Sequence, residues 1–121
     1  MRQNHNREAL NMKIVSLKKG REFSDAYKYG NSKANKYLVM YVRNNELTYN
    51  RIGISVSKKV GNSVVRHRIR RLIRECLRIN GDVFNIGLDI VVIARGTAKD
   101  RTFAEINDAV MHLASVHKII S

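Results

Sequence analysis

The residues of this sequence that are best suited to chemistry are arginines, and one segment concentrates them. Between Lys58 and Arg78 the chain carries eight cationic residues and one acidic residue, Glu75. From position 66 onward every cationic residue of the segment is arginine. A guanidinium binds phosphate through two parallel hydrogen bonds and stacks on bases, whereas an ammonium acts as a point charge. The segment therefore predicts a surface that binds a polyanion.

The same segment has the pattern of an amphipathic helix, with Asn62 as its N-cap and Asn80-Gly81 at its end. At about 100° per residue, an aliphatic stripe from Val65 to Cys76 falls on one side and Arg68 lies toward a flank. The basic residues expected to face outward are Arg66, His67, Arg70, Arg71, Arg74 and Arg78. A solvated face usually mixes Lys with Glu, so binding is favoured over mere solvation. Since the stripe contains no aromatic residue, docking on a membrane is disfavoured.

The whole chain agrees with this interpretation. It has 121 residues, a net charge of +13 and one cysteine. These values fit a single domain that binds a polyanion in a reducing compartment. The polar stretch 1–11 is expected to be a flexible N-terminal extension, and 12–121 a single domain. Because the sequence contains no secretory signal and no apolar run long enough to span a bilayer, we expect a cytoplasmic protein.

The elements that must position the arginines follow from periodicity and turn residues. A first helix ends at Gly30, and a capping box at Thr102 and Glu105 opens the last helix. The core stripe of that helix is Phe103, Ile106, Val110 and Leu113, with His117 as a further candidate. The first two strands are expected to be antiparallel. The expected elements are a helix over 18–29, strands over 37–43 and 51–57, a helix over 63–79, a strand over 88–94 and a helix from 102. The order α-β-β-α-β-α predicts an α+β fold, in outline a two-layer sandwich.

Alternation along the first two strands separates two faces. Leu38, Met40 and Val42 are expected to line the core together with Ile52, Ile54 and Val56. The opposite face carries Tyr37 and Tyr41 beside Ser55, with arginines at its border. Tyrosines on such a face can stack unpaired bases, or they can simply be strand formers that cover a helix. The residues alone leave both interpretations open.

Groups for catalysis are not brought together by the sequence. The four histidines are scattered, and His112 and His117 are five residues apart, which does not match paired metal ligands at i, i+4. Cys76 falls on the aliphatic stripe and is expected to be a small buried hydrophobe. We therefore expect a protein that binds but does not itself catalyse, with no metal site of its own.

The segment 55–75, SVSKKVGNSVVRHRIRRLIRE, resembles the signature S-K-K-x-G-N-A-V-x-R-N-R-x-K-R of the bacterial ribonuclease P protein family. Leu17–Phe23 (LKKGREF) resembles the first helix of that family, and Ile90–Arg95 (IVVIAR) resembles its third strand. The resemblance covers roughly residues 12–118. One departure is His67, which stands where the family usually has Asn.

The resemblance implies a ribosomal-protein-like fold (ribosomal S5 domain 2-like) with an unusual left-handed βαβ crossover. It implies the protein subunit of a ribonucleoprotein endoribonuclease that removes the 5′ leader of precursor tRNA. The partners would be the catalytic RNA and precursor tRNA, with Mg²⁺ held mainly by RNA activating the attacking water. The protein alone would be inactive and monomeric, with one copy per catalytic RNA, and it would bind neither DNA nor membrane.

The resemblance also assigns roles to individual positions. The residues that match contacts to the catalytic RNA are Lys58, Lys59, Arg66, Arg68 and Arg71. The residues that match the leader cleft and its edge are Phe23, Tyr27, Tyr41, Ser55, His67, Arg70 and Arg74.

Two other classes of function fit the charge of the chain. A structural ribosomal protein or RNA chaperone would share the fold, but would sediment with ribosomes and show no preference for tRNA with a leader. A helix-turn-helix regulator of DNA is weaker, because two predicted strands separate the basic helix from the helix before it.

Overall fold

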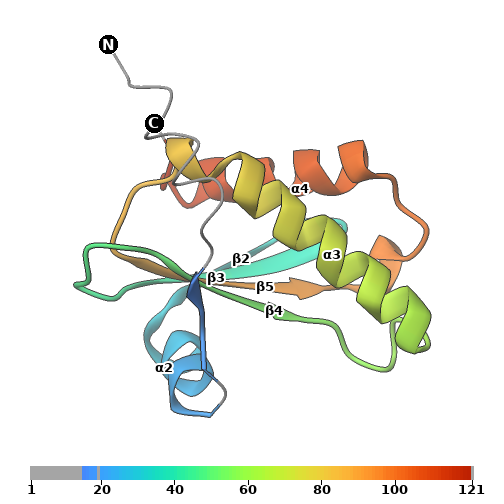
Figure 1. The fold of residues 1–121 in the computed structure, drawn as a ribbon, viewed down its shortest axis with the longest axis horizontal. Helices are drawn as coiled ribbons and strands as arrows, with labels where there is room; N and C mark the ends of the chain where they lie inside the picture. Colours follow the sequence, from blue (N-terminus) through green and yellow to red (C-terminus); the bar gives the residue numbers. More distant parts are fainter. Residues whose placement is uncertain (1–14, 19, 121) are drawn as a thin grey trace.

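A computed structural model describes residues 15–18 and 20–120; the predicted extension 1–11 lies outside the described residues. The described part forms one five-stranded mixed sheet with α-helices against it (Figure 1). The strands are β1 (Val15–Ser16), β2 (Asn31–Ala34), β3 (Leu38–Asn44), β4 (Arg51–Ser55) and β5 (Leu88–Ala94). The helices of this part are α2 (Arg21–Tyr29), α3 (Ser63–Ile79) and α4 (Phe103–Val116), with 3-10 turns at Gly81–Val83 and Gly96–Ala98.

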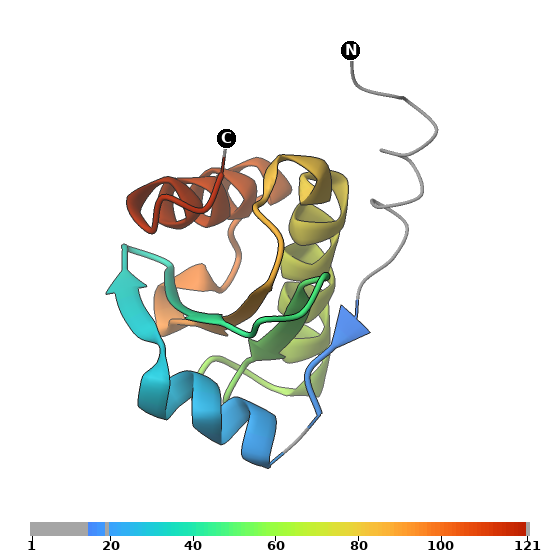
Figure 2. The same ribbon diagram turned by 90° about the vertical axis from the view of Figure 1, so that its left-hand side faces the viewer.

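The helices lie on both faces of the sheet. In Figure 2, α3 and α4 cover one face and α2 lies against the other. The main core is the sandwich between the sheet and the pair α3 and α4, and a smaller cluster joins α2 to the opposite face. The predicted α+β class is confirmed, and α2 adds a covering helix to the face that the sequence left open.

The order of strands is β1-β4-β5-β3-β2. β5 pairs antiparallel with β3 and parallel with β4, so β3 and β4 run in opposite directions, as predicted, but do not pair. The connection from β4 through α3 to β5 joins adjacent parallel strands and is a βαβ unit. The handedness of this crossover stays a prediction.

Two short strands at the edges were missed by the sequence prediction. β2, with the sequence NSKA, is exposed along its whole length and pairs on one side only, with β3. β1 contains two residues that pair with Arg51 and Ile52. Polar or very short edge strands leave no alternation of apolar residues, which is why periodicity did not indicate them.

The core follows the predicted parity. Leu38, Met40 and Val42 are buried against the α3 and α4 side, and all of β5 except Ile93 is buried. On α4, Ile106, Val110 and Leu113 are fully buried, whereas Phe103 is 36% exposed. The prediction for Phe103 was wrong, because the first turn of α4 extends beyond the packed part of the helix. Among the described residues, no helix is long and apolar enough to cross a bilayer.

Candidate nucleic-acid interface

The basic helix α3 begins as the sequence predicts. The side-chain Oδ1 of Asn62 accepts a hydrogen bond from the backbone N–H of Val65 at 3.0 Å, which satisfies a free donor at the helix start. Ile69, Ile73, Cys76 and Leu77 are buried against the sheet and α4. This packing fixes the rotation of α3 about its axis and therefore decides which of its side chains face outward.

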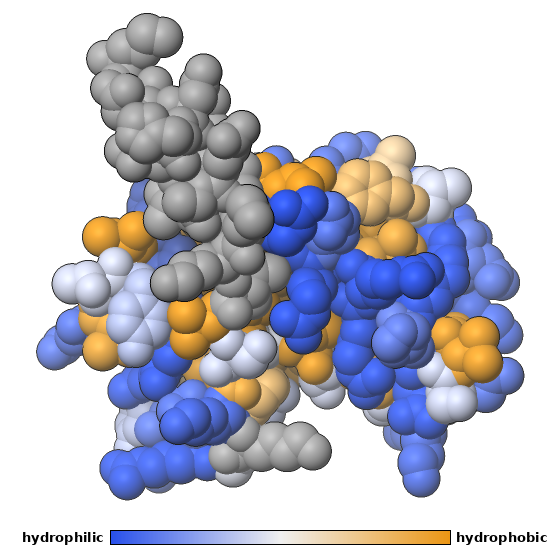
Figure 3. Space-filling view, in the orientation of Figure 1, coloured by the Kyte–Doolittle hydropathy of each residue, from blue (hydrophilic) through white to orange (hydrophobic). Residues whose placement is uncertain are grey.

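The outward side of α3 is basic. His67, Arg71 and Arg74 are exposed, and Arg70 is half-buried. None of these four pairs with a carboxylate among residues 15–18 and 20–120. In the space-filling view, hydrophilic residues cover most of the surface over α3 (Figure 3). The predicted row of outward cations is therefore present, with its charges uncompensated in the described part of the chain.

The placement of Arg66 differs from the prediction. Arg66 precedes Ile73 by seven residues, a spacing that differs by only about 20° around a helix, so it starts on the inward side. Its stem is half-buried and its Nε donates to the carbonyl of Gly61 at 3.2 Å. A long stem along apolar surface with its charged end at the border is common for arginine. The role of Arg66 as an RNA contact stays a prediction.

Two other arginines of α3 have partners within the protein. Arg68 is half-buried and its Nη2 donates to the carbonyl of Arg101 at 3.0 Å. Arg78 pairs with Glu75 one turn earlier, with Nε donating to Oε1 at 3.1 Å. The hydrogen bond and the charge of Glu75 raise the pKa of Arg78. The last turn of α3 is therefore less available to a polyanion than its middle.

The aromatic residues of the predicted leader cleft meet on the opposite face of the sheet. The ring centroids of Tyr27 on α2 and Tyr41 on β3 are 5.0 Å apart in an edge-to-face arrangement, and those of Phe23 and Tyr27 are 6.3 Å apart. Burial, followed by the neighbouring Tyr41, raises the pKa of Tyr27. Ser55 ends β4 on the same face. A partly exposed aromatic cluster of this kind can stack unpaired bases.

The other predicted members of this face are placed differently. Tyr37 precedes β3 and packs against the main core instead, with Lys36 and Arg101 near its ring. His67, Arg70 and Arg74 lie on α3, across the sheet from α2 (Figure 2). A ligand in contact with both groups has to pass around the border of the sheet.

A cluster of charged residues near the aromatic face was not recognised from the sequence. Asp89 on β5 is fully buried and lies between Arg43 on β3 and Arg51 on β4. Tyr29, 63% exposed, lies beside Arg43, with 6.0 Å from the guanidinium carbon to the ring centroid. The partners of Asp89 come from separate segments, so no local sequence signal marks them.

Neither a metal-binding cluster nor a reactive cysteine is found in the part of the chain that the structure describes. There, no three His, Cys, Asp or Glu side chains are grouped so that they could hold a metal ion. Cys76 is fully buried, as predicted, and burial raises the pKa of its thiol to about 12. A thiol with that pKa stays protonated at neutral pH and is a poor nucleophile.

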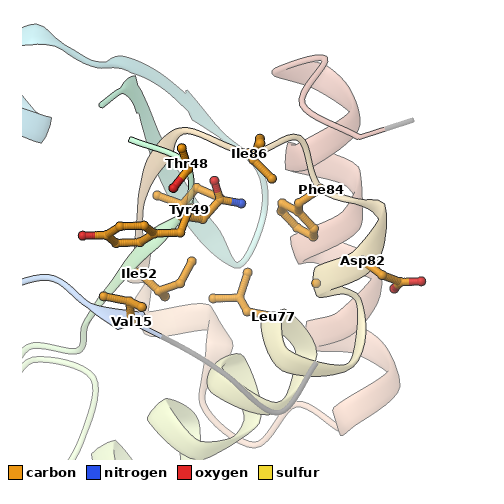
Figure 4. Close-up of a pocket in the computed structure, with 11 residues that line it drawn as sticks. Val15, Thr48, Tyr49, Ile52, Leu77, Asp82, Phe84 and Ile86 are labelled. Atoms are coloured by element: carbon orange, nitrogen blue, oxygen red, sulfur yellow. The ribbon is translucent and has the colours of Figure 1, made fainter. Parts of the chain in front are cut away.

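One cavity lies away from both surfaces. It has a volume of about 510 Å³ and lies between the 48–50 loop, the start of β4 and the end of α3 (Figure 4). Ile52, Leu77 and Phe84 point toward its interior, whereas the carboxylate of Asp82 points away. The lining is mostly apolar and contains none of the predicted RNA contacts.

The fold and the site together define a small α+β domain with a basic helix on one face of its sheet and an aromatic cluster on the other, an arrangement typical of nucleic-acid-binding proteins. The Ribonuclease P family model matches residues 12–118. The ribonuclease P protein component of Lachnoclostridium phytofermentans is 63% identical over 106 residues, covering 88% of this chain and 91% of the relative. That of Clostridioides difficile is 51% identical over 98 residues, covering 80% and 86% respectively.

Solved structures agree with these sequence matches. The RNase P protein of Staphylococcus aureus superposes with a TM-score of 0.82 at 41% identity, covering 90% of this chain and all of that chain. The RNase P protein of Thermotoga maritima gives a TM-score of 0.78 at 32% identity, covering 84% and 96%. The chain belongs to the ribonuclease P protein family. This membership confirms the resemblance and supports a role in tRNA 5′ processing.

Proposed function

We propose that this chain is the protein subunit of a ribonucleoprotein endoribonuclease that binds the catalytic RNA and the 5′ leader of precursor tRNA. The observation that carries the proposal is the middle of α3, where Arg70, Arg71 and Arg74 point outward without carboxylate partners in the described part of the chain. Neighbouring unpaired guanidiniums repel one another, and phosphate groups remove that repulsion. Lys58 and Lys59, both exposed before α3, extend the same surface.

The leader would bind at the aromatic cluster. Phe23, Tyr27 and Tyr41 offer rings at the junction of α2 and the sheet, and Ser55 offers a hydroxyl close to the start of the basic segment. Stacking on such rings tolerates any base, which suits leaders of varied sequence. His67, Arg70 and Arg74 would hold the leader backbone where it turns around the sheet edge.

Catalysis would be carried by the RNA. Mg²⁺, held mainly by RNA, would supply the activated water for hydrolysis of the phosphodiester. The described residues offer no cluster for that ion, so the protein would act by screening repulsion between RNAs and by holding the leader. We expect the free protein to be a cytoplasmic monomer that joins one catalytic RNA.

The test is reconstitution. Cleavage of a precursor tRNA is measured at low Mg²⁺ with the protein alone, with a bacterial ribonuclease P RNA alone, and with both. We expect no cleavage by the protein alone and faster cleavage by the RNA when the protein is added. Cleavage by the protein alone, or no stimulation of the RNA, would overturn the proposal. Sedimentation with ribosomes and no preference for leader-bearing tRNA would favour a ribosomal role instead.

The position of α2 disfavours the DNA-binding alternative. A helix-turn-helix needs two helices in contact, with the second in the major groove. α2 lies on the opposite face of the sheet from α3 (Figure 2), and three strands separate the two helices in the chain.

A further inference from the structure

One buried carboxylate joins three strands below α2. Asp89 on β5 is the cross-strand partner of both Arg43 on β3 and Arg51 on β4. Its two oxygens accept from Nε and Nη2 of Arg51, each at 2.8 Å, and Oδ1 also accepts from Nδ2 of Asn45 at 2.8 Å. Arg43 Nη1 lies 3.6 Å from Oδ2. The carboxylate is fully buried, so these contacts replace the water that it loses on folding.

Arg51 extends this network to α2. Its remaining terminal nitrogen, Nη1, lies 3.1 Å from Oε2 of Glu22 in the first turn of the helix. Glu22 Oε1 in turn accepts from the backbone N–H of Lys18 at 2.7 Å. The guanidinium of Arg51 thus contacts one carboxylate in the sheet and one on α2. Because its side chain is only 18% exposed and directed to these two carboxylates, Arg51 is not placed to bind phosphate itself.

The network holds the flank of α2 that lies away from the aromatic rings. At about 100° per residue, Phe23 and Tyr27 lie about 100° and 140° around the helix from Glu22. Ala26 lies between these flanks and is fully buried on the sheet. One side of α2 is therefore held by the ion pair between Glu22 and Arg51, and the other presents its rings beside Tyr41. A rotation of α2 that breaks the ion pair also moves the rings.

A close packing contact limits how near α2 can come to the sheet. The ring of Phe23 lies directly over Gly53, where an added Cβ would be 2.6 Å from its Cε1. The helix cannot move closer to the sheet at this point, and the ion pair between Glu22 and Arg51 opposes its moving away. The contact and the network together determine the distance and the rotation of α2.

We propose that Arg51 is a positioning residue for leader binding: fixed by Asp89, it holds Glu22 and thereby sets the orientation in which Phe23 and Tyr27 meet Tyr41. This inference rests on the proposed leader site. It assigns no contact with RNA to Arg51. It predicts that changes in the network lower the affinity for the leader while the basic surface of α3 stays intact.

The experiment compares Arg51→Lys and Glu22→Gln in the holoenzyme formed with a bacterial ribonuclease P RNA. Lysine at position 51 keeps the charge but cannot contact both oxygens of Asp89 and Glu22 at once. Glutamine at position 22 keeps an oxygen for the N–H of Lys18 but removes the ion pair with Arg51. The matched control is Arg21→Lys, because Arg21 belongs to the same helix but, within the described ranges, pairs only with Asp25 on the exposed side. Dissociation constants are measured for one tRNA with and without its leader, and their ratio gives the leader advantage.

We expect both network variants to reduce the leader advantage by up to about tenfold, the effect of losing about one stacked base. The affinities for mature tRNA and for the catalytic RNA should stay close to those of the unchanged protein, as should all values for Arg21→Lys. Equal losses for tRNA with and without a leader would show a merely structural network and overturn the inference. An unchanged leader advantage in both variants would also overturn it.

Tyr41→Ala separates this inference from the proposed function. If Tyr41→Ala leaves the leader advantage unchanged, the proposed leader site itself is wrong, and the positioning role fails with it. If Tyr41→Ala lowers the leader advantage while Arg51→Lys and Glu22→Gln do not, only the positioning role is wrong. Cooperative thermal unfolding of each variant shows whether it has folded. Glu22→Gln leaves the pair between Arg51 and Asp89 in place, so the sheet keeps its buried ion pair.

Discussion

The exposed arginines of α3 allow a quantitative test of phosphate binding. Arg71 and Arg74 are exposed and have no carboxylate partner among the described residues. Each lost phosphate contact lowers the slope of log affinity against log salt by about 0.9 for a duplex. Replacing both residues with alanine should therefore remove about 1.8 units of slope. The double variant should therefore lose more affinity, relative to the unchanged protein, at low salt than at high salt. The factor lost should be about 12-fold larger at about 50 mM than at about 200 mM, a fourfold change in salt.

The assay is the fluorescence anisotropy of a labelled bacterial ribonuclease P RNA, titrated with protein at several salt concentrations. Arg78→Ala is the matched control on the same helix, because Arg78 is already paired with Glu75. Arg78→Ala should change the salt slope by clearly less than Arg71→Ala or Arg74→Ala alone. Circular dichroism shows whether α3 is retained. An unchanged slope in a folded double variant would mean that these guanidiniums do not contact phosphate, and the binding interpretation of α3 would be wrong.

Three further predictions concern the aromatic face and the start of α3. Tyr41→Ala should weaken binding of leader-bearing tRNA about tenfold more than that of mature tRNA, whereas Tyr41→Phe keeps the stacking ring; equal losses in a binding assay would remove it from the leader site. Gly53→Ala should lower the free energy of unfolding by about 1–3 kcal/mol, because the new methyl group overlaps Phe23. In the same denaturant titration Gly96→Ala, with open space around it, should have little effect. Asn62→Ala should cost about 1 kcal/mol of stability in that titration by removing the cap of α3.

Local patterns predicted the features of this fold that depend on local physics. The cap at Asn62, the capping box at Thr102 and the alternation in β3 all appear as expected. Each depends on residues a few positions apart, so periodicity and side-chain chemistry are sufficient to find it. The resemblance to the family motif added the expected partners and the expected roles of individual residues, which no local pattern contains.

The arrangement of strands could not be predicted in this way. The sequence places β3 and β4 next to each other, but β5 enters between them and pairs with both. A central position suits β5, because it is apolar on both faces and buries both. Asp89 is the exception within that strand, and its partners become visible only when β5 lies between Arg43 and Arg51. The charged network is therefore a consequence of strand order.

The two proposed RNA-binding surfaces are also close together in the chain. β4 contributes Ser55 to the aromatic face, and residues 56–62 then lead directly to the cap of α3 on the opposite face. Lys58 and Lys59 lie within this connection and are exposed. Under the proposed function, the leader and the catalytic RNA would contact segments that are joined by one short loop. A shift of that loop would alter both contacts, so binding of one RNA should influence the affinity for the other, and by thermodynamic linkage the influence must be reciprocal.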